Sequence, residues 1–242
     1  MSERIVFELR VPSCAKVKDV KFIPKYNFVA ATMEYEGRAI TFLRTDFLEF
    51  KPEAWDYAEK FSDTQYSEVI PEVVTESIKK CGGIYISRDF HQTTEDGKRW
   101  VTSGGKTRKG MSYVQAECLA ALGEIPEMES SLIYGVVYDM IGKWLIATES
   151  LTEEEWAQSP ESVEKQNEIL NRDCGGWTIK ELLGDIFQFE WTKERFEQKW
   201  PVARCGIPHD DGERKYPARK RYAYKPDMYH SETVARTMWY FK

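Results

Sequence analysis

The sequence predicts an α+β fold, with an N-terminal antiparallel sheet that contains hairpins and a helix-rich C-terminal half. The first 50 residues show the two-residue alternation of half-buried strands, whereas residues from 152 onward show helical patterns and helix caps. Strands and helices do not alternate regularly, so a parallel βαβ sheet is not expected. We expect a mixed part (1–150) and a mostly helical part (151–242), or one single domain, which 242 residues also allow.

Four strands are expected near the N-terminus. Apolar residues alternate with polar ones over 5–11, and 17–23 is a second candidate strand. Residues 28–35 and 38–43 flank Glu36-Gly37. A two-residue connection that contains glycine is typical of a hairpin, because its tight turn needs positive φ.

Two helices and another hairpin follow. A helix is expected over about 52–61, which begins with a proline, and another over about 67–80, where an apolar stripe ends in a glycine pair. Residues 84–90 and 98–102 then flank Asp96-Gly97. Asp-Gly is a strong turn signal, so these two stretches are predicted to pair with each other.

The remaining elements are a helix, an ambiguous stretch and the helical C-terminal part. A helix is expected over about 111–122. Residues 132–149 fit either two strands or one buried helix, and their β-branched and aromatic residues favour strands. Capping boxes begin at Thr152 and Thr178, where a glutamate follows three residues later, and Pro201 is expected to end the helical run.

Composition narrows the classes of function. No run approaches the roughly 18 apolar residues of a membrane span, and the charged N-terminus lacks a secretory apolar region. We therefore expect a cytoplasmic protein with no membrane partner. The five cysteines are widely spaced without a CxxC pair, which indicates free thiols, and the three histidines show no ligand spacing. Neither a metal site nor a cofactor is expected.

A basic, tyrosine-rich segment, residues 212–225, stands out in an acidic chain. It carries six positive charges and one negative charge, whereas the formal net charge of the chain is −6. Arg and Lys neutralise phosphates and tyrosine rings stack on bases, so the segment is a candidate contact for a protein or nucleic acid. The alternative is that the cationic side chains extend into solvent along an edge strand, where they discourage aggregation. The predicted binding residues here are Arg214, Lys215, Arg219, Lys220, Arg221, Tyr222 and Tyr224.

A second candidate is the glycine-rich basic loop over 104–110. It precedes a predicted helix, and helix N-termini attract anions. Gly105-Lys106-Thr107 resembles the end of a phosphate-binding loop, but Trp100 stands where that motif needs its first glycine. The loop is therefore either a phosphate or protein contact or a solvated loop. Its candidate residues are Lys106, Arg108 and Lys109.

Acidic residues supply the last candidates. Glu117, Asp139 and Glu149 have the order of a metal-dependent nuclease site, but Leu151 replaces the lysine expected after the last carboxylate. Residues 149–168 contain seven glutamates and one lysine. This stretch either suits helix N-termini or docks on a basic partner surface. Trp156 within it is a candidate interface anchor.

Two functions fit these features. We favour a non-enzymatic interaction protein that binds a protein or nucleoprotein partner through charge-complementary patches. In composition the chain resembles small, acidic, tryptophan-rich accessory or inhibitor proteins of viruses and mobile elements. The alternative is an enzyme that acts on nucleotides or nucleic acid. In that case the basic loop would bind phosphate, and Asp139 and Glu149 would bind a metal ion or act as bases. The enzyme hypothesis requires Lys106 and Asp139 to share one pocket.

Overall fold

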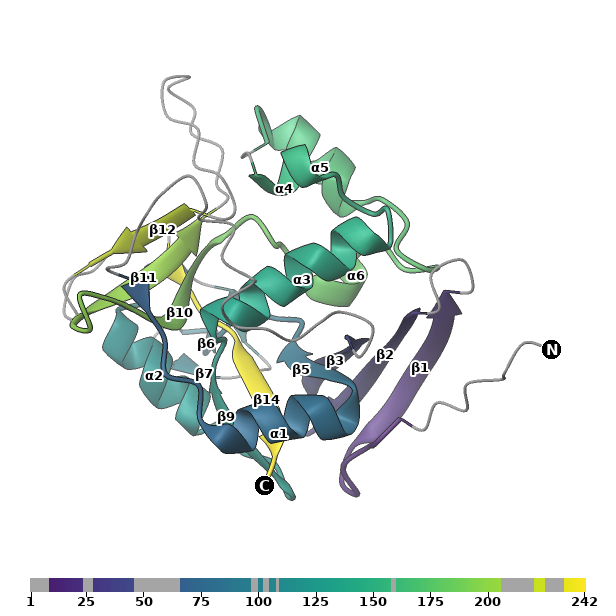
Figure 1. Cartoon of the computed structure of the whole chain (residues 1–242), viewed down its shortest axis with the longest axis horizontal. Coiled ribbons are helices and arrows are strands. Elements are labelled where there is room, and N and C mark those ends of the chain that lie inside the picture. The colour runs from purple at the N-terminus through teal and green to yellow at the C-terminus, as the bar shows by residue number, and fades with distance from the viewer. Residues whose placement is uncertain are drawn as a thin grey trace.

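Antiparallel strands from both ends of the chain build the main sheet (Figure 1). In spatial order they are β1 (Lys16–Ile23), β2 (Phe28–Tyr35), β3 (Arg38–Arg44), β5 (Gly83–Ser87), β14 (Thr237–Phe241) and β9 (Met128–Leu132). The C-terminal strand β14 lies between β5 and β9, so the sheet takes strands from both sides of residue 150. The computed structural model describes residues 9–23, 28–45, 66–96, 100–101, 105–107, 109–157, 160–205, 220–224 and 233–242.

The first hairpin forms where the sequence predicts it. Tyr35 pairs with Arg38, which leaves Glu36 and Gly37 as the connection. Both connecting residues have positive φ, 46° and 76°, which matches the right-handed twist of the paired strands. β1 likewise confirms the predicted strand at 17–23. Of the predicted strand at 5–11, only residues 9–11 are described, and they lie outside any strand.

A second sheet corrects the prediction of a helix-rich C-terminal half. Its order is β12 (Lys220–Ala223), β11 (Trp200–Cys205), β10 (Phe189–Phe196) and β13 (Thr233–Val234), and β4 (Tyr66–Ser67) also pairs with β10. Both faces of β10 are buried, with Trp191 on one face and Glu190 and Glu194 on the other. These glutamates bind buried arginines, and the stretch that was predicted to be helical up to Pro201 is a strand here. Pro201 lies within β11.

β5 does not form the predicted hairpin with residues 98–102. It pairs with β3 and β14 in the main sheet. The strand that pairs with β7 (Trp100–Val101) is β6 (Gln92–Thr93), which also pairs with β8 (Lys106–Thr107) in a small third sheet. The Asp-Gly signal therefore indicated the right region but the wrong partner strand.

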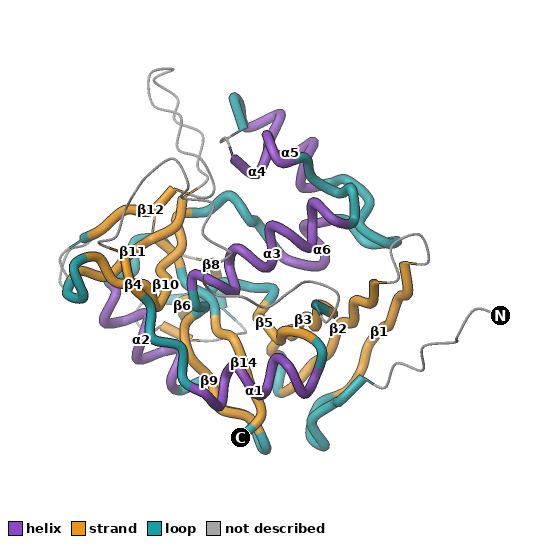
Figure 2. The backbone as a smooth tube through the Cα atoms, viewed as in Figure 1, coloured by secondary structure: helices purple, strands orange, loops and turns teal. Residues whose placement is uncertain are grey.

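Six helices are described (Figure 2), namely α1 (Glu72–Cys81), α2 (Tyr113–Ala121), α3 (Gly135–Ala147), α4 (Glu153–Ala157), α5 (Val163–Leu170) and α6 (Ile179–Leu183). α1 and α2 confirm predicted helices, and α1 ends at Gly82, which has φ 65°. Both capping boxes form, since the backbone N–H groups of Glu155 and Glu181 each donate to the threonine hydroxyl three residues earlier at 3.1 Å. The predicted helix at 52–61 lies outside the described residues.

Residues 135–147 form one buried helix, α3, and not the two predicted strands. Ten of its thirteen residues are buried. A helix buried on all sides is apolar all round, which hides the 3.6-residue period that distinguishes a helix from a strand. Val137 and Ile141 share one core cluster with Leu43 and Ile86 of the main sheet and Leu182 of α6. Figure 1 shows α3 crossing the middle of the molecule beside α6.

Candidate interaction surfaces

Glutamates are concentrated in the segment that contains α4 and α5. Residues 149–168 contain seven glutamates and Lys165, a net charge of −6 that equals the formal net charge of the whole chain. Figure 1 shows the two helices at the outer side of the molecule, above α3. We call the exposed glutamates of this segment the acidic surface: Glu149, Glu153, Glu154, Glu161, Glu164 and Glu168.

Helix capping explains part of this acidic composition. Thr152 caps α4 and Ser162 caps α5, whose Lys165 N–H donates to the Ser162 hydroxyl at 3.1 Å. Negative charge is favourable near a helix N-terminus because the first N–H groups carry partial positive charge. The backbone N–H of Glu164 and the Ser162 hydroxyl accordingly hold the pKa of the Glu164 carboxyl below its ordinary value.

Arg172 fixes α4 relative to α5. Its guanidinium donates to both Glu155 carboxylate oxygens, at 2.7 and 2.8 Å, and to Glu168 at 3.2 Å. Lys165 also binds Glu168, at 2.8 Å. These bonds lower the pKa of the Glu155 carboxyl, mainly through Arg172. The glutamates that join the two helices are thus distinct from most of those that face solvent.

Trp156 is an internal anchor, which corrects its prediction as an interface residue. Its side chain is buried, with 1% exposure, and its ring centroid lies 5.3 Å from that of Tyr138 on α3. A Cβ on Gly142 would lie 2.2 Å from the indole, so the glycine makes room for it. Trp156 therefore holds the acidic surface on α3 and does not meet a partner in this conformation.

The described part of the basic segment lies at a sheet edge. Lys220, Arg221 and Tyr222 belong to β12, which is the last described strand of the second sheet. Tyr224 packs edge-on against Phe189 and Trp191, with ring centroids 5.7 Å apart in each case. This corrects the prediction of Tyr224 as a free stacking platform. The other predicted binding residues of the segment lie outside the described residues: Arg214, Lys215 and Arg219.

The basic loop does not place its cations at open N–H groups of α2. Lys106 in β8 and Lys109 are exposed, and Arg108 lies outside the described residues. The N–H groups of Gly110 and Met111, which follow the loop, both donate to the Thr233 carbonyl, at 2.8 and 3.2 Å. A capping box from Ser112 to Gln115 then closes the helix start. An anion at the loop would therefore meet mainly lysine side chains.

Asp139 is closed off from solvent, which removes it from the enzyme hypothesis. Its Oδ2 lies 3.0 Å from Arg204 Nη2, and Arg204 also binds Glu194 at 2.6 Å (Nε to Oε2). The Asp139 and Arg204 side chains are 3% and 1% exposed. Lys106, by contrast, is exposed. Among the described residues, no group of three His, Cys, Asp or Glu side chains is arranged to hold a metal ion.

Glu68, the residue after β4, lies beside the same buried cluster, and no feature of the sequence indicated this position. Its two carboxylate oxygens accept hydrogen bonds from Gly135 N at 2.6 Å and Val136 N at 3.0 Å, the first residues of α3. Burial, and then the nearby Glu194 carboxylate, raise the pKa of Glu68 to about 8. Glu68 therefore keeps its proton to a higher pH than an ordinary carboxyl group does.

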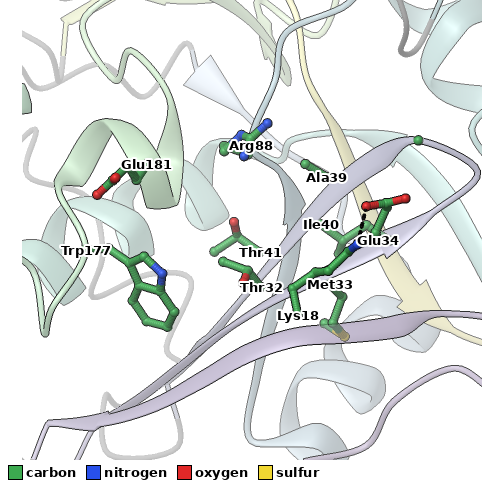
Figure 3. Close-up of a pocket in the computed structure, with 11 residues that line it drawn as sticks. Lys18, Thr32, Met33, Glu34, Ala39, Ile40, Thr41, Arg88, Trp177 and Glu181 are labelled. Carbon is green, nitrogen blue, oxygen red and sulfur yellow. Dashed lines mark ion pairs between the residues drawn. The ribbon is translucent and has the colours of Figure 1, made fainter.

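Sequence reasoning also missed the exposed face of β1 and the recess beside it. Three apolar side chains of this strand are exposed: Val17 (42%), Val20 (47%) and Phe22 (53%). A recess of about 370 Å³ lies on the other face of the sheet. Figure 3 shows Trp177 and Glu181 on one side of it, Lys18 and Glu34 on the other, and Thr32 and Thr41 between them. The signal that could have indicated two solvent-facing sides is the four charged residues among the first six of β1, because a strand buried on one face carries fewer charges.

Comparisons with known proteins identify no relative. No family model matches the chain, and neither a curated protein nor a solved structure is similar to it. None of the helices in the described part of the chain is long and apolar enough to span a membrane.

Proposed function

We propose that this chain is a non-enzymatic interaction protein whose acidic surface docks on a basic surface of a protein or nucleoprotein partner. The observation that carries the proposal is the exposure of six glutamates, four of them on α4 and α5, in a segment that is fixed to the body of the protein. These six side chains are exposed to solvent, whereas Asp139, on which the enzyme hypothesis relied, is neutralised internally.

A fixed charged surface favours recognition for two reasons. Opposite potentials on two proteins raise the rate of productive encounter. In addition, side chains on a rigid support lose little further freedom on binding. Arg172 supplies part of that support by joining α4 to α5, and Trp156 supplies another part by packing on Tyr138 of α3. The basic segment, 212–225, stays a second predicted contact.

Charge-matched variants test the proposal. Glu153→Gln, Glu161→Gln and Glu164→Gln together remove three charges from the acidic surface. The control variant carries three exposed substitutions elsewhere: Glu72→Gln, Glu76→Gln and Glu124→Gln. Both variants have the same formal charge. Binding to an immobilised poly-L-lysine surface is measured by biolayer interferometry over a range of NaCl concentrations, and circular dichroism melting checks folding.

The acidic-surface variant is expected to bind about tenfold more weakly than the wild type at low salt, since each exposed charge pair contributes roughly 0.5 kcal/mol. The control variant is expected to change affinity by less than about twofold, and wild-type binding is expected to weaken with salt. Equal losses in the two variants would show that net charge, and not this surface, governs binding, and the proposal would then be rejected.

A further inference from the structure

β1 is the end strand of the main sheet. It pairs with β2, and no described strand pairs with its other edge. Six of its eight residues are exposed. An exposed edge strand presents unpaired N–H and C=O groups that can pair with another chain. In Figure 1 β1 lies away from α4 and α5, so the two surfaces can be tested separately.

The two faces of β1 differ in chemistry. Lys21 pairs opposite Ala30 and Ile23 opposite Phe28, on the face that carries Trp177, over which the Lys21 ammonium lies at 4.3 Å. Asp19 is on this same face, 3.6 Å from Lys21. Val20 and Phe22 point to the opposite face, where they are about half exposed. The strand therefore offers alternating charge on one face and apolar side chains on the other.

The regular part of the edge is short. The pairing of β1 with β2 is irregular between Val17 and Asp19, so regular pairing covers Asp19–Ile23. The bulged residue, Lys18, binds Glu34 of the same chain at 2.8 Å. A bulge and lysines at an edge limit pairing. A partner strand can therefore pair regularly only with the residues after the bulge.

We propose that β1 pairs antiparallel with β1 of a second copy of this chain, in a two-fold register centred on Val20. In this register Asp19 of each copy lies opposite Lys21 of the other, on one face. The two Val20 side chains lie directly opposite each other on the other face, each with Phe22 of the other copy as its diagonal neighbour. The main sheets of the two copies then form one continuous sheet.

Charge complementarity selects the second copy and this register. A two-fold register centred on Lys21 would place two ammonium groups side by side, and one centred on Asp19 would oppose two carboxylates; like charges directly opposite are destabilising. Centring on Val20 gives two opposite-charge pairs from Asp19 and Lys21 within the regular stretch, and an apolar patch from Val20 and Phe22. Phe22 of each copy then lies opposite the bulged Lys18 of the other. A two-fold interface uses the same surface on both copies and so must be complementary to itself, as this one is.

The salt dependence of dimerisation differs from that of binding to an oppositely charged partner. Each copy has a formal net charge of −6, so two copies repel each other at a distance. Salt screens that repulsion, while the close contacts between strands are less affected. Dimerisation of the full chain is therefore expected to strengthen as NaCl rises, which is opposite to the behaviour expected for the acidic surface on poly-L-lysine.

Single cysteines test the register in the full chain. The background carries Cys14→Ser and Cys118→Ser, which removes the described cysteines that are not buried. Val20→Cys is expected to form a disulfide-linked dimer on mild oxidation, because directly opposite Cα atoms lie within disulfide reach. Phe22→Cys is expected not to, because the two positions 22 are four residues apart along the strands, about 13 Å. Equal cross-linking at both positions, or none at position 20, would overturn the register.

A charge swap tests the pairing by sedimentation equilibrium. Asp19→Lys and Lys21→Asp are each expected to weaken the dimer about tenfold, because each converts two attractive pairs to repulsive ones. The double swap restores complementarity and is expected to recover wild-type affinity, although it lacks the native contact of Lys21 with Trp177. Melting temperatures confirm that the variants fold. A wild type that stays monomeric at every concentration and salt, or a double swap as weak as the single ones, would refute self-pairing.

Discussion

Asp139→Asn removes one charge from a deeply buried cluster of three ionised side chains. Arg204 stands between Asp139 and Glu194, with N–O distances of 3.0 and 2.6 Å, and all three side chains are at most 5% exposed. The asparagine keeps the shape of the side chain but withdraws a carboxylate that offsets the desolvation of the guanidinium. The substitution therefore isolates charge from packing.

Burial sets the size of the expected effect. Breaking a buried ion pair typically costs about 3–5 kcal/mol, because the remaining charge keeps its desolvation penalty without its partner. Glu194 still neutralises Arg204 in the variant, so we expect a loss near the lower end, about 3 kcal/mol. Glu155→Gln supplies the contrast: its pair with Arg172 is partly solvated, at 20% and 29% exposure, and should contribute at most about 1 kcal/mol.

Equilibrium unfolding in urea measures both variants against the wild type, and the m-value checks that the unfolding transition stays two-state. The reasoning requires Asp139→Asn to lower the unfolding free energy clearly more than Glu155→Gln does. If the two losses were equal and below about 1 kcal/mol, Asp139 would be solvated in the native protein, and its availability as an enzyme residue would have to be reconsidered.

Two further predictions concern Glu68 and Trp156. Because the folded-state pKa of Glu68, about 8, lies above the ordinary 4.5, the folded state binds its proton more tightly and stability falls as pH rises between these values. Glu68→Gln should remove that part of the pH dependence in urea titrations; an unchanged slope would contradict it. Trp156→Ala should cost about 3–5 kcal/mol and weaken poly-L-lysine binding although no charge changes, and unaltered binding would show that the acidic surface does not depend on this anchor.

Local signals predicted the elements that depend on few neighbours. The connection at Glu36-Gly37 needs positive φ at two adjacent residues, which glycine marks in the sequence. Capping at Thr152 and Thr178 likewise depends on residues three apart. By contrast, the turn between β10 and β11 places Glu197 and Gln198 at positive φ, 51° and 57°, with no glycine to mark it. That turn could not be predicted from residue type.

Elements set by long-range contacts were missed for a common reason. β14 enters the main sheet between strands that precede it by more than 100 residues, and no local pattern specifies such a neighbour. Glutamates in β10 look solvent-facing in the sequence, yet Glu190 binds Arg236 at 2.7 Å with both side chains at most 2% exposed. A charged residue is predicted to be exposed unless a partner that neutralises it can be identified. The partner of Glu190 is Arg236, 46 residues later in the chain, so no local pattern indicates it.

The candidate surfaces also combine features that local sequence indicates with features that depend on long-range contacts. The acidic surface was visible in the sequence because its charge is concentrated in 20 consecutive residues, whereas its support was not, because Trp156 reaches α3 across the fold. Isolated helices as short as α4 are not stable in water. The five residues of α4 therefore depend on tertiary contacts, among them those with Tyr138 and Arg172, to hold their carboxylates in place. A run of glutamates with such anchors is a defined surface, whereas the same run without them would be a flexible polyanion, and the difference lies in the buried tryptophan.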